Sequence, residues 1–275
     1  MTTRYAALVY GSDEAAFRQA WMLFVSLAAY AGPSAEFVAL TDHPERFESF
    51  RGAVATERLS REQLQAWRRG SSGWRHKLEA ERALMPPSRA LVLLDSDVVA
   101  VQPLEPFVRE LQGGAVFLHK PEYVIGESRR RGNRRMWESL RDRSFGGWRV
   151  LPTDAMWNAG VVGLRSEDAF LVNDALVMHD AIASAGADHP FLEQLTTSVV
   201  FGRTRRLKPA APYFAHYWGN KAGWDGEIRK RVARARGWTL EQAADEYRQN
   251  PINLPLEVRP TRLQKLGRWF RRARG

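Results

Sequence analysis

Two aspartates, separated by a single residue, follow a continuous apolar run. Residues 90–94 read ALVLL, and Asp95 and Asp97 come directly after them. Alternate residues of an extended chain project to the same side, so both carboxylates can face one point. Two close carboxylates repel each other unless a cation lies between them. Oxygen ligands favour Mg²⁺ or Mn²⁺, ions that also bind phosphates, so the pair predicts a metal site. A strand-end turn with capping aspartates is the structural alternative.

A strand that ends in a cleft must position this pair, and the surrounding pattern predicts one. Strand-like segments occur at residues 5–10, 36–41, 53–57, 90–95, 158–164 and 213–218. Helix-like segments occur at 14–31 and 74–85, and from Ser166 as N-cap to about 185, with Ser60 and Gln63 as a capping box of a short helix. This alternation predicts an α/β fold with a mostly parallel sheet flanked by helices. Ligands of such sheets bind at the carboxyl ends of the strands.

The stretch from 121 to 150 has the least regular pattern and includes RRRGNRR at 129–135. We interpret it as a loop or lid. The whole chain is predicted to form one domain over residues 1–225, which includes this stretch, and a small C-terminal helical segment over 226–275.

The charge of the chain is concentrated at its C-terminus. The chain has 275 residues, no Cys and a formal net charge of +10, and removal of the seven basic residues of 259–275 lowers this to +3. The nearly balanced remainder argues against a nucleic-acid partner. Leu263, Leu266 and Phe270 follow helical spacing among these basic residues, which is typical of a segment that lies on an anionic membrane. A solvated tail is the alternative.

The remaining bulk features predict a soluble, cytoplasmic protein with a peripheral membrane contact through this tail. The first residues lack the pattern of a signal peptide, and the longest apolar run, 21–31, is too short to span a bilayer. The absence of Cys excludes disulfides and thiolate metal sites.

Five blocks of the sequence, between residues 5 and 224, resemble the glycogenin-like and bacterial lipopolysaccharide galactosyltransferase group of GT-A glycosyltransferases. In order, they are ALVYGSDEAAFRQAWMLFVSL, HKLEAERAL with LVLLDSDVVAVQPLEPF, WNAGVVGL, PFLEQ and HYWGNKAGW. The resemblance implies the GT-A fold, a Rossmann-like sheet. Two departures concern the site: Glu193 stands where the family usually has Asp, and NKAGW replaces its Lys-Pro-Trp element.

The resemblance also implies roles for individual residues. Asp95, Asp97 and His216 would ligate Mn²⁺ or Mg²⁺, and Glu193, Gln194 and Lys221 would serve catalysis. Residues that would contact the nucleotide-sugar donor are Tyr10, Gly11, Asp13, Lys77, Asp95, Ser96, Asn158, Gly219 and Lys221. Each has a plain structural alternative, such as a half-buried strand histidine for His216, a solvated lysine for Lys221 and a turn for Gly219.

The expected function is transfer of a hexose, with retention of configuration, from a nucleotide sugar such as a UDP-sugar to a glycan or lipid-linked acceptor. A front-face displacement is preferred to a covalent route, for which Glu193 is the candidate nucleophile. A phosphate-rich acceptor, with RRRGNRR contributing, is a further alternative. A sugar-phosphate nucleotidyltransferase would need a Gly-rich basic loop after the first strand, and VYGSDEAAF has one Gly and no basic residue. A non-catalytic nucleotide- or carbohydrate-binding scaffold would not need Asp95, Asp97, His216 and Lys221 together.

Overall fold

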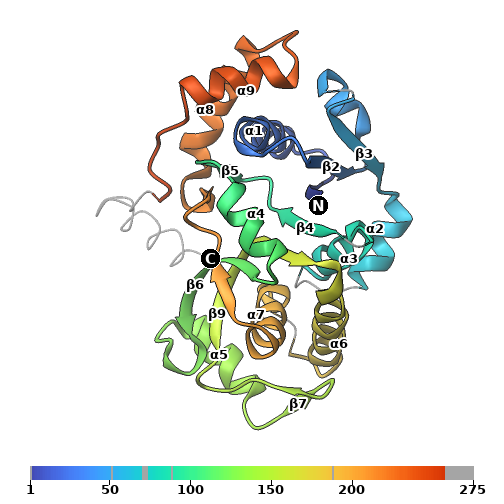
Figure 1. Cartoon of the computed structure of the whole chain (residues 1–275). Helices are drawn as coiled ribbons and strands as arrows, with labels where there is room; N and C mark the ends of the chain where they lie inside the picture. Colours follow the sequence, from blue (N-terminus) through green and yellow to red (C-terminus); the bar gives the residue numbers. More distant parts are fainter. Residues whose placement is uncertain (1, 51, 70–73, 88, 188, 258–275) are drawn as a thin grey trace, which may run out of the picture.

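A seven-stranded sheet forms the centre of the protein in a computed structural model, which describes residues 2–50, 52–69, 74–87, 89–187 and 189–257 (Figure 1). The strand order is β10-β6-β9-β4-β1-β2-β3. The strands are β1 (Thr3–Val9), β2 (Ala35–Thr41), β3 (Val54–Arg58), β4 (Ala90–Leu94), β6 (Val116–Val124), β9 (Ala155–Arg165) and β10 (Leu207–Pro209). Neighbouring strands are parallel, except that β9 is antiparallel to both β4 and β6. The predicted α/β, Rossmann-like class is confirmed.

Helices cover both faces of this sheet. The α-helices are α1 (Glu14–Tyr30), α2 (Arg61–Arg68), α3 (Arg75–Leu84), α4 (Glu105–Gln112), α5 (Arg131–Leu140), α6 (Phe170–Ser184), α7 (Leu192–Thr204), α8 (Lys221–Arg234) and α9 (Leu240–Gln249). Single turns of 3-10 helix are η2 (Ile125–Glu127), η3 (Ser166–Asp168) and η4 (Trp218–Asn220), and η1 (Pro44–Phe50) is longer. The predicted N-cap of α2 is confirmed, since the Ser60 hydroxyl accepts the Gln63 N–H at 3.0 Å.

The strand that ends in the aspartates is buried along its whole length. Ala90, Val92 and Leu94 pack in one hydrophobic cluster with α1. Leu91 and Leu93 point to the other face, where they pack with residues of α3. Because both faces are covered, β4 carries no polar side chain before Asp95, which is what its continuous apolar run predicts.

Two short sheets complete the part of the chain that the structure describes. In one, β5 (Val98–Ala100) pairs antiparallel with β11 (Phe214–His216). In the other, β7 (Ser144–Phe145) and β8 (Trp148–Arg149) form a hairpin. The predicted late strand over 213–218 is therefore confirmed for its central residues only, and η4 follows it.

Two local predictions were wrong. Residues 121–150 are not an irregular loop, because β6 continues to Val124 and α5 follows after η2. Met136 and Leu140, four residues apart, form the buried side of α5, while its arginines are exposed. Ser166 does not cap α6 with its side chain: it opens η3, and its carbonyl accepts the N–H of Ala169.

The C-terminal helices pack on the main domain. Trp224 and Ile228 of α8 and Tyr247 of α9 belong to the same buried cluster as α1 and β1. The predicted boundary between residues 225 and 226 falls within α8. The basic segment 259–275 lies outside the described residues. Among the helices that are described, none has the length and apolarity needed to cross a membrane.

Candidate metal centre and cavity

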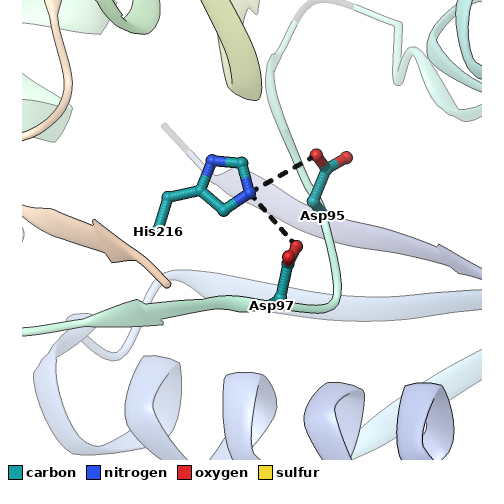
Figure 2. A group of neighbouring side chains, drawn as sticks. All are labelled: Asp95, Asp97 and His216. Atoms are coloured by element: carbon teal, nitrogen blue, oxygen red, sulfur yellow. Dashed lines mark hydrogen bonds and ion pairs between the residues drawn. The ribbon is translucent and has the colours of Figure 1, made fainter. Parts of the chain in front are cut away.

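Asp95, Asp97 and His216 converge from three elements (Figure 2). Asp95 directly follows β4, Asp97 directly precedes β5, and His216 ends β11, opposite Val98 of β5. The His216 Nε2 atom lies 3.2 Å from Asp97 Oδ1 and 3.9 Å from Asp95 Oδ2. Adjacent ligands on an octahedral ion, with bonds of about 2.1 Å, lie roughly 3 Å apart. A small closing movement would therefore let these three side chains hold one metal ion.

Asn158 orients the imidazole of His216. The Asn158 Oδ1 atom lies 3.0 Å from His216 Nδ1 and also accepts the Gly160 N–H at 3.0 Å, while its Nδ2 donates to Glu122 Oε1 at 3.2 Å. Since this oxygen can only accept, His216 Nδ1 must carry a proton. In a neutral His216 the lone pair of Nε2 then faces the two aspartates, which is the tautomer that a metal ligand requires.

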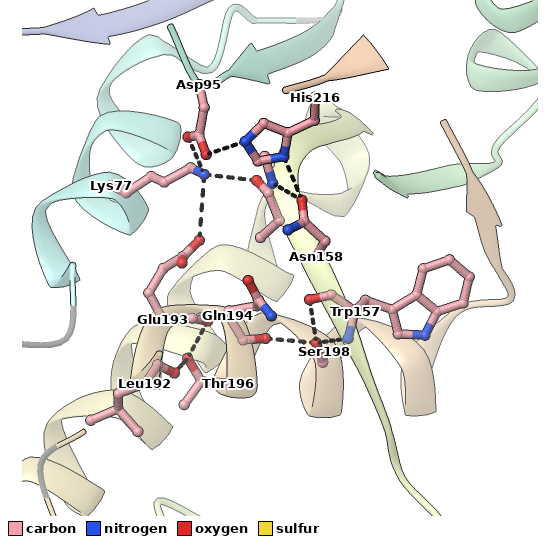
Figure 3. Close-up of polar contacts among 12 residues, drawn as sticks. Lys77, Asp95, Trp157, Asn158, Leu192, Glu193, Gln194, Thr196, Ser198 and His216 are labelled. Carbon is pink, nitrogen blue, oxygen red and sulfur yellow. Dashed lines mark hydrogen bonds and ion pairs between the residues drawn. The ribbon is translucent and has the colours of Figure 1, made fainter. Parts of the chain in front are cut away.

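Lys77 is buried against Asp95 (Figure 3). Its Nζ atom donates to Asp95 Oδ1 at 2.6 Å and to the Ala159 carbonyl at 2.7 Å, and it lies 3.9 Å from Glu193 Oε1. Burial alone would lower the pKa of Lys77, but the charges of Asp95 and Glu193 outweigh burial and raise it. Lys77 therefore stays charged and compensates Asp95.

Asp97 has two cationic or hydrogen-bonding partners. Lys221 is the first residue of α8, and its Nζ atom lies 2.8 Å from Asp97 Oδ2. The Lys221 side chain is 56% exposed. Burial alone would raise the pKa of Asp97, but a hydrogen bond and a positive charge from His216, when its Nε2 is also protonated, together with the charge of Lys221, hold it well below its usual range. A metal ion bound to the Nε2 of neutral His216 would supply that positive charge instead. Asp97 is thus ionised, as a carboxylate metal ligand must be, and the Lys221 side chain remains accessible to solvent.

A cavity of about 460 Å³ opens beside this cluster. Its walls come from the end of β4, the start of the antiparallel β9, the end of β6 and the start of α7. Nine of the predicted site residues line it: Lys77, Asp95, Ser96, Asp97, Asn158, Glu193, Gln194, His216 and Lys221. Trp74, Phe191 and Trp218 also line it, and each is about half exposed. Apolar faces beside a few convergent polar groups are typical of small-molecule sites.

Glu193 and Gln194 stand at the start of α7 on the floor of the cavity. Gln194 Nε2 donates to Glu122 Oε2 at 2.9 Å, so both oxygens of Glu122 are bound by amides. Glu193 is buried, and burial raises its pKa to about 7, with Lys77 opposing this rise and Asp95 adding to it. Its Oε1 atom accepts no hydrogen bond from the described residues.

Four predicted donor contacts are not among the residues that line this cavity. The Tyr10 hydroxyl is 2.8 Å from His76 Nε2, and the Gly11 N–H donates to Asp42 at 3.1 Å. Asp13 caps α1 by accepting the Ala15 N–H at 2.9 Å. At Gly219 an added Cβ would lie 2.8 Å from Glu257 Cγ, so the close approach there is to the chain at 256–257.

The sequence interpretation missed several residues of the cavity. Glu122 falls in the segment interpreted as a loop, and nothing in the local pattern indicates it. Arg130 belongs to RRRGNRR, whose charge is the signal for the phosphate-rich acceptor named as an alternative. Gly160 lies two residues after Asn158 on β9, and this spacing on one strand face was the available signal. An added Cβ at Gly160 would lie 2.4 Å from His216 Nδ1, so only glycine fits beside the imidazole.

The comparisons with known proteins add no assignment to this geometry. The chain matches no family model, and no curated protein matches it significantly. The resemblance to glycosyltransferases therefore depends on the five sequence blocks alone.

Proposed function

We propose that the chain is a metal-dependent glycosyltransferase that moves a hexose from a nucleotide sugar, a UDP-sugar, to a hydroxyl of a glycan or lipid-linked saccharide. The observation that carries this proposal is the convergence of Asp95, Asp97 and His216 on a cavity that also presents Lys221. Amide side chains and aromatic faces, groups that suit sugar hydroxyls and rings, line the same cavity.

Asp95, Asp97 and His216 would hold the ion, and the imidazole favours Mn²⁺ over Mg²⁺. When bound, a divalent cation supplies Lewis-acid stabilisation to the diphosphate of the donor. Lys221 supports the same charge: its ammonium moves from Asp97 to the diphosphate and stabilises the negative charge that develops as the glycosidic bond breaks. Lys77 stays on Asp95 and keeps that carboxylate in place.

Asn158 and Gln194 position the sugar. Both amides donate to Glu122, which fixes their orientation, and both residues line the cavity. A pre-oriented amide loses little freedom when it binds a hydroxyl, so these residues contribute to orientation of the reacting carbon.

We prefer the front-face route because it needs no carboxylate nucleophile. Glu193 is the candidate nucleophile for a covalent route, and burial, which raises its pKa to about 7, leaves it only partly ionised near neutral pH. In the front-face route the acceptor oxygen bonds to the anomeric carbon as the bond to the diphosphate breaks on the same face. The acceptor proton passes to the departing phosphate oxygen, and configuration is retained.

A donor screen tests the proposal. UDP-hexoses are incubated with the protein with and without Mn²⁺, and UDP release is measured together with thermal stabilisation. We expect both signals to require Mn²⁺ and to vanish with EDTA. Asp97→Asn should lower UDP release on the order of 100-fold or more, because one ionised ligand is lost, without a matching loss of melting temperature.

Asp245→Asn on α9 is the matched control, since it removes the same charge far from the cavity. Metal-independent UDP release, or equal release by the Asp97 and Asp245 variants, would contradict the proposal. Pyrophosphate release from UTP and a sugar phosphate would instead identify a nucleotidyltransferase.

A further inference from the structure

Four carboxylates line the cavity: Asp95, Asp97, Glu122 and Glu193. Asp95 pairs with Lys77, and Asp97 pairs with His216 and Lys221. Both oxygens of Glu122 accept hydrogen bonds from amides. Glu193 is buried, and its Oε1 lies 3.9 Å from Lys77 Nζ. Among the described residues, none of the four carboxylates forms an ion pair with a residue of the wall that α5 contributes.

Arg130 lies on that wall. It lines the cavity, is exposed, and forms no ion pair with any residue that the structure describes, in contrast to Lys77 and Lys221. It directly precedes α5, and Asn133, one turn later, lines the cavity beside it. Asn133 donates to the Ser128 hydroxyl at 2.8 Å, so its amide has a fixed orientation.

The surroundings of Arg130 raise the positive potential on this wall. Residues 129–135 contain five arginines and no acidic residue, and the next acid, Glu138, pairs with Arg134 at 3.2 Å. In Figure 1, α5 lies at the opposite end of the molecule from α8, whose first residue is Lys221. The cavity thus has one cationic group on the α8 side, next to the candidate metal site, and another on the α5 side.

We propose that Arg130, together with Asn133, is the subsite for an anionic group, a phosphate or a carboxylate, on the acceptor saccharide. This inference depends on the proposed glycosyltransferase function. The diphosphate of a nucleotide sugar is assigned to the metal and Lys221, so a second cation on another wall of the same cavity serves a second anion. A guanidinium binds phosphate or carboxylate through two parallel hydrogen bonds, which also fixes the direction of the acceptor.

The test measures acceptor binding by calorimetry with three probes: glucose, glucose 6-phosphate and glucuronate. Each is titrated into protein saturated with UDP and Mn²⁺, and again into protein without them. We expect wild-type protein to bind one or both anionic sugars about 10-fold or more tighter than glucose, since hydrogen bonds to charged groups are the stronger ones. The more tightly bound probe identifies phosphate or carboxylate as the anion.

Arg130→Gln should abolish this preference, and Arg130→Lys should retain part of it. Arg131→Gln is the matched control. It removes the same charge at the next residue, whose side chain does not line the cavity. Equal affinity of wild-type protein for all three sugars, or an equal loss in the Arg130 and Arg131 variants, would overturn the subsite. A loss of UDP affinity in Arg130→Gln with the sugar preference unchanged would place Arg130 at the donor and also overturn it.

Failure of the general proposal gives a different result. If the protein is not a UDP-sugar enzyme, UDP with Mn²⁺ does not bind to it. The sugar titrations into protein without UDP and Mn²⁺ still show whether Arg130 selects anionic sugars.

Discussion

Gly160 lies where β9 comes closest to the imidazole of His216. An added Cβ would stand 2.4 Å from both Nδ1 and Cε1 of His216 and 3.0 Å from Asn158 Oδ1. Gly160→Ala should therefore displace the ring from the aspartates, and we expect Mn²⁺ affinity to fall on the order of 10-fold or more, as when metal ligands lose their supporting contacts. Titration of the protein with Mn²⁺, followed by electron paramagnetic resonance, measures this.

Gly163→Ala on the same strand is the control. Its added Cβ would meet Phe107 at 3.3 Å, away from the metal ligands, so it tests whether crowding β9 alone lowers metal affinity. The Gly163 variant should lose stability by no more than roughly 1–3 kcal/mol and keep its Mn²⁺ affinity. Wild-type Mn²⁺ affinity in Gly160→Ala would show that His216 is not a ligand.

Glu81 gives the protein a pH-dependent stability. It is fully buried on α3, neither of its oxygens has a hydrogen-bond partner among the described residues, and burial, with Glu193 adding, raises its pKa to about 8. Between the ordinary pKa of about 4.5 and this value, the folded chain holds a proton that the unfolded chain has released. Stability is thus complete below about pH 4.5, decreases as the pH rises toward about 8, and is no longer changed by this group above that.

Glu81→Gln removes this titration. Compared with wild type, Glu81→Gln should lose less stability between pH 5 and pH 9, by on the order of 4 kcal/mol, since the raised pKa lies about three pH units above pH 5 and each unit corresponds to about 1.4 kcal/mol. Urea unfolding of both proteins at the two pH values measures the difference. Parallel pH profiles for the two proteins would mean that Glu81 is ionised in the fold throughout this range.

The grouping of the three candidate metal ligands could be predicted from the sequence because their signal is local. Asp95 and Asp97 lie two residues apart after an apolar strand, and His216 lies in a short strand followed by Gly219 and Lys221. The importance of Glu122, in contrast, arises from contacts with Asn158 and Gln194, which are 36 and 72 residues away in the chain. No pattern within one segment encodes such a contact, so only the fold reveals it.

At the scale of single elements, α8 places Lys221 at the site. Trp224 of α8 stacks on Tyr217 with ring centroids 4.3 Å apart, and the Tyr217 N–H donates to the Asp97 carbonyl at 3.1 Å. Trp224→Ala should lower the free energy of unfolding by about 3–5 kcal/mol. It should also weaken Mn²⁺–UDP binding, because α8 loses its attachment beside Asp97. Urea unfolding and calorimetry measure the two effects.

Trp238→Ala tests the same residue type outside the site. Trp238 is partly buried against the same hydrophobic cluster, so its loss should lower stability but leave Mn²⁺–UDP affinity unchanged. Trp224→Phe, which keeps an aromatic face on Tyr217, should retain most of both properties and serves if the alanine variant does not fold. Equal nucleotide affinity in all three variants would show that α8 does not position Lys221.

The type of an element could be predicted from the sequence where the element is continuously apolar. The prediction was wrong where polar residues dominate the element. The five buried residues of β4 indicated a covered strand, whereas the arginines of α5 obscured a buried face formed by Met136 and Leu140. The direction of a strand in the sheet also could not be predicted from the hydrophobic pattern. The run at 158–164 indicated a strand, but its antiparallel direction, which brings Asn158 and Gly160 beside Asp95, follows from pairing and not from hydrophobicity.

At the scale of the whole molecule, one edge of the sheet gathers the chemistry and the core anchors it. The end of β4, the end of β6 and the start of the antiparallel β9 meet at this edge. On the α1 face, α8 and α9 complete the cluster around α1, and the Tyr247 hydroxyl donates to the Ala100 carbonyl of β5 at 3.2 Å. The C-terminal helices therefore support the strand that follows Asp97.

The C-terminal basic segment predicts membrane association of the whole protein. Truncation after Glu257 keeps every described contact and lowers the formal net charge from +10 to +3. Since each basic residue near an anionic surface contributes about 1 kcal/mol, the full chain should sediment with phosphatidylserine vesicles in a salt-dependent manner, and the truncated chain should not. Both should have similar melting temperatures and bind phosphatidylcholine vesicles equally weakly. Equal sedimentation of the two chains with anionic vesicles would contradict a membrane role for residues 258–275.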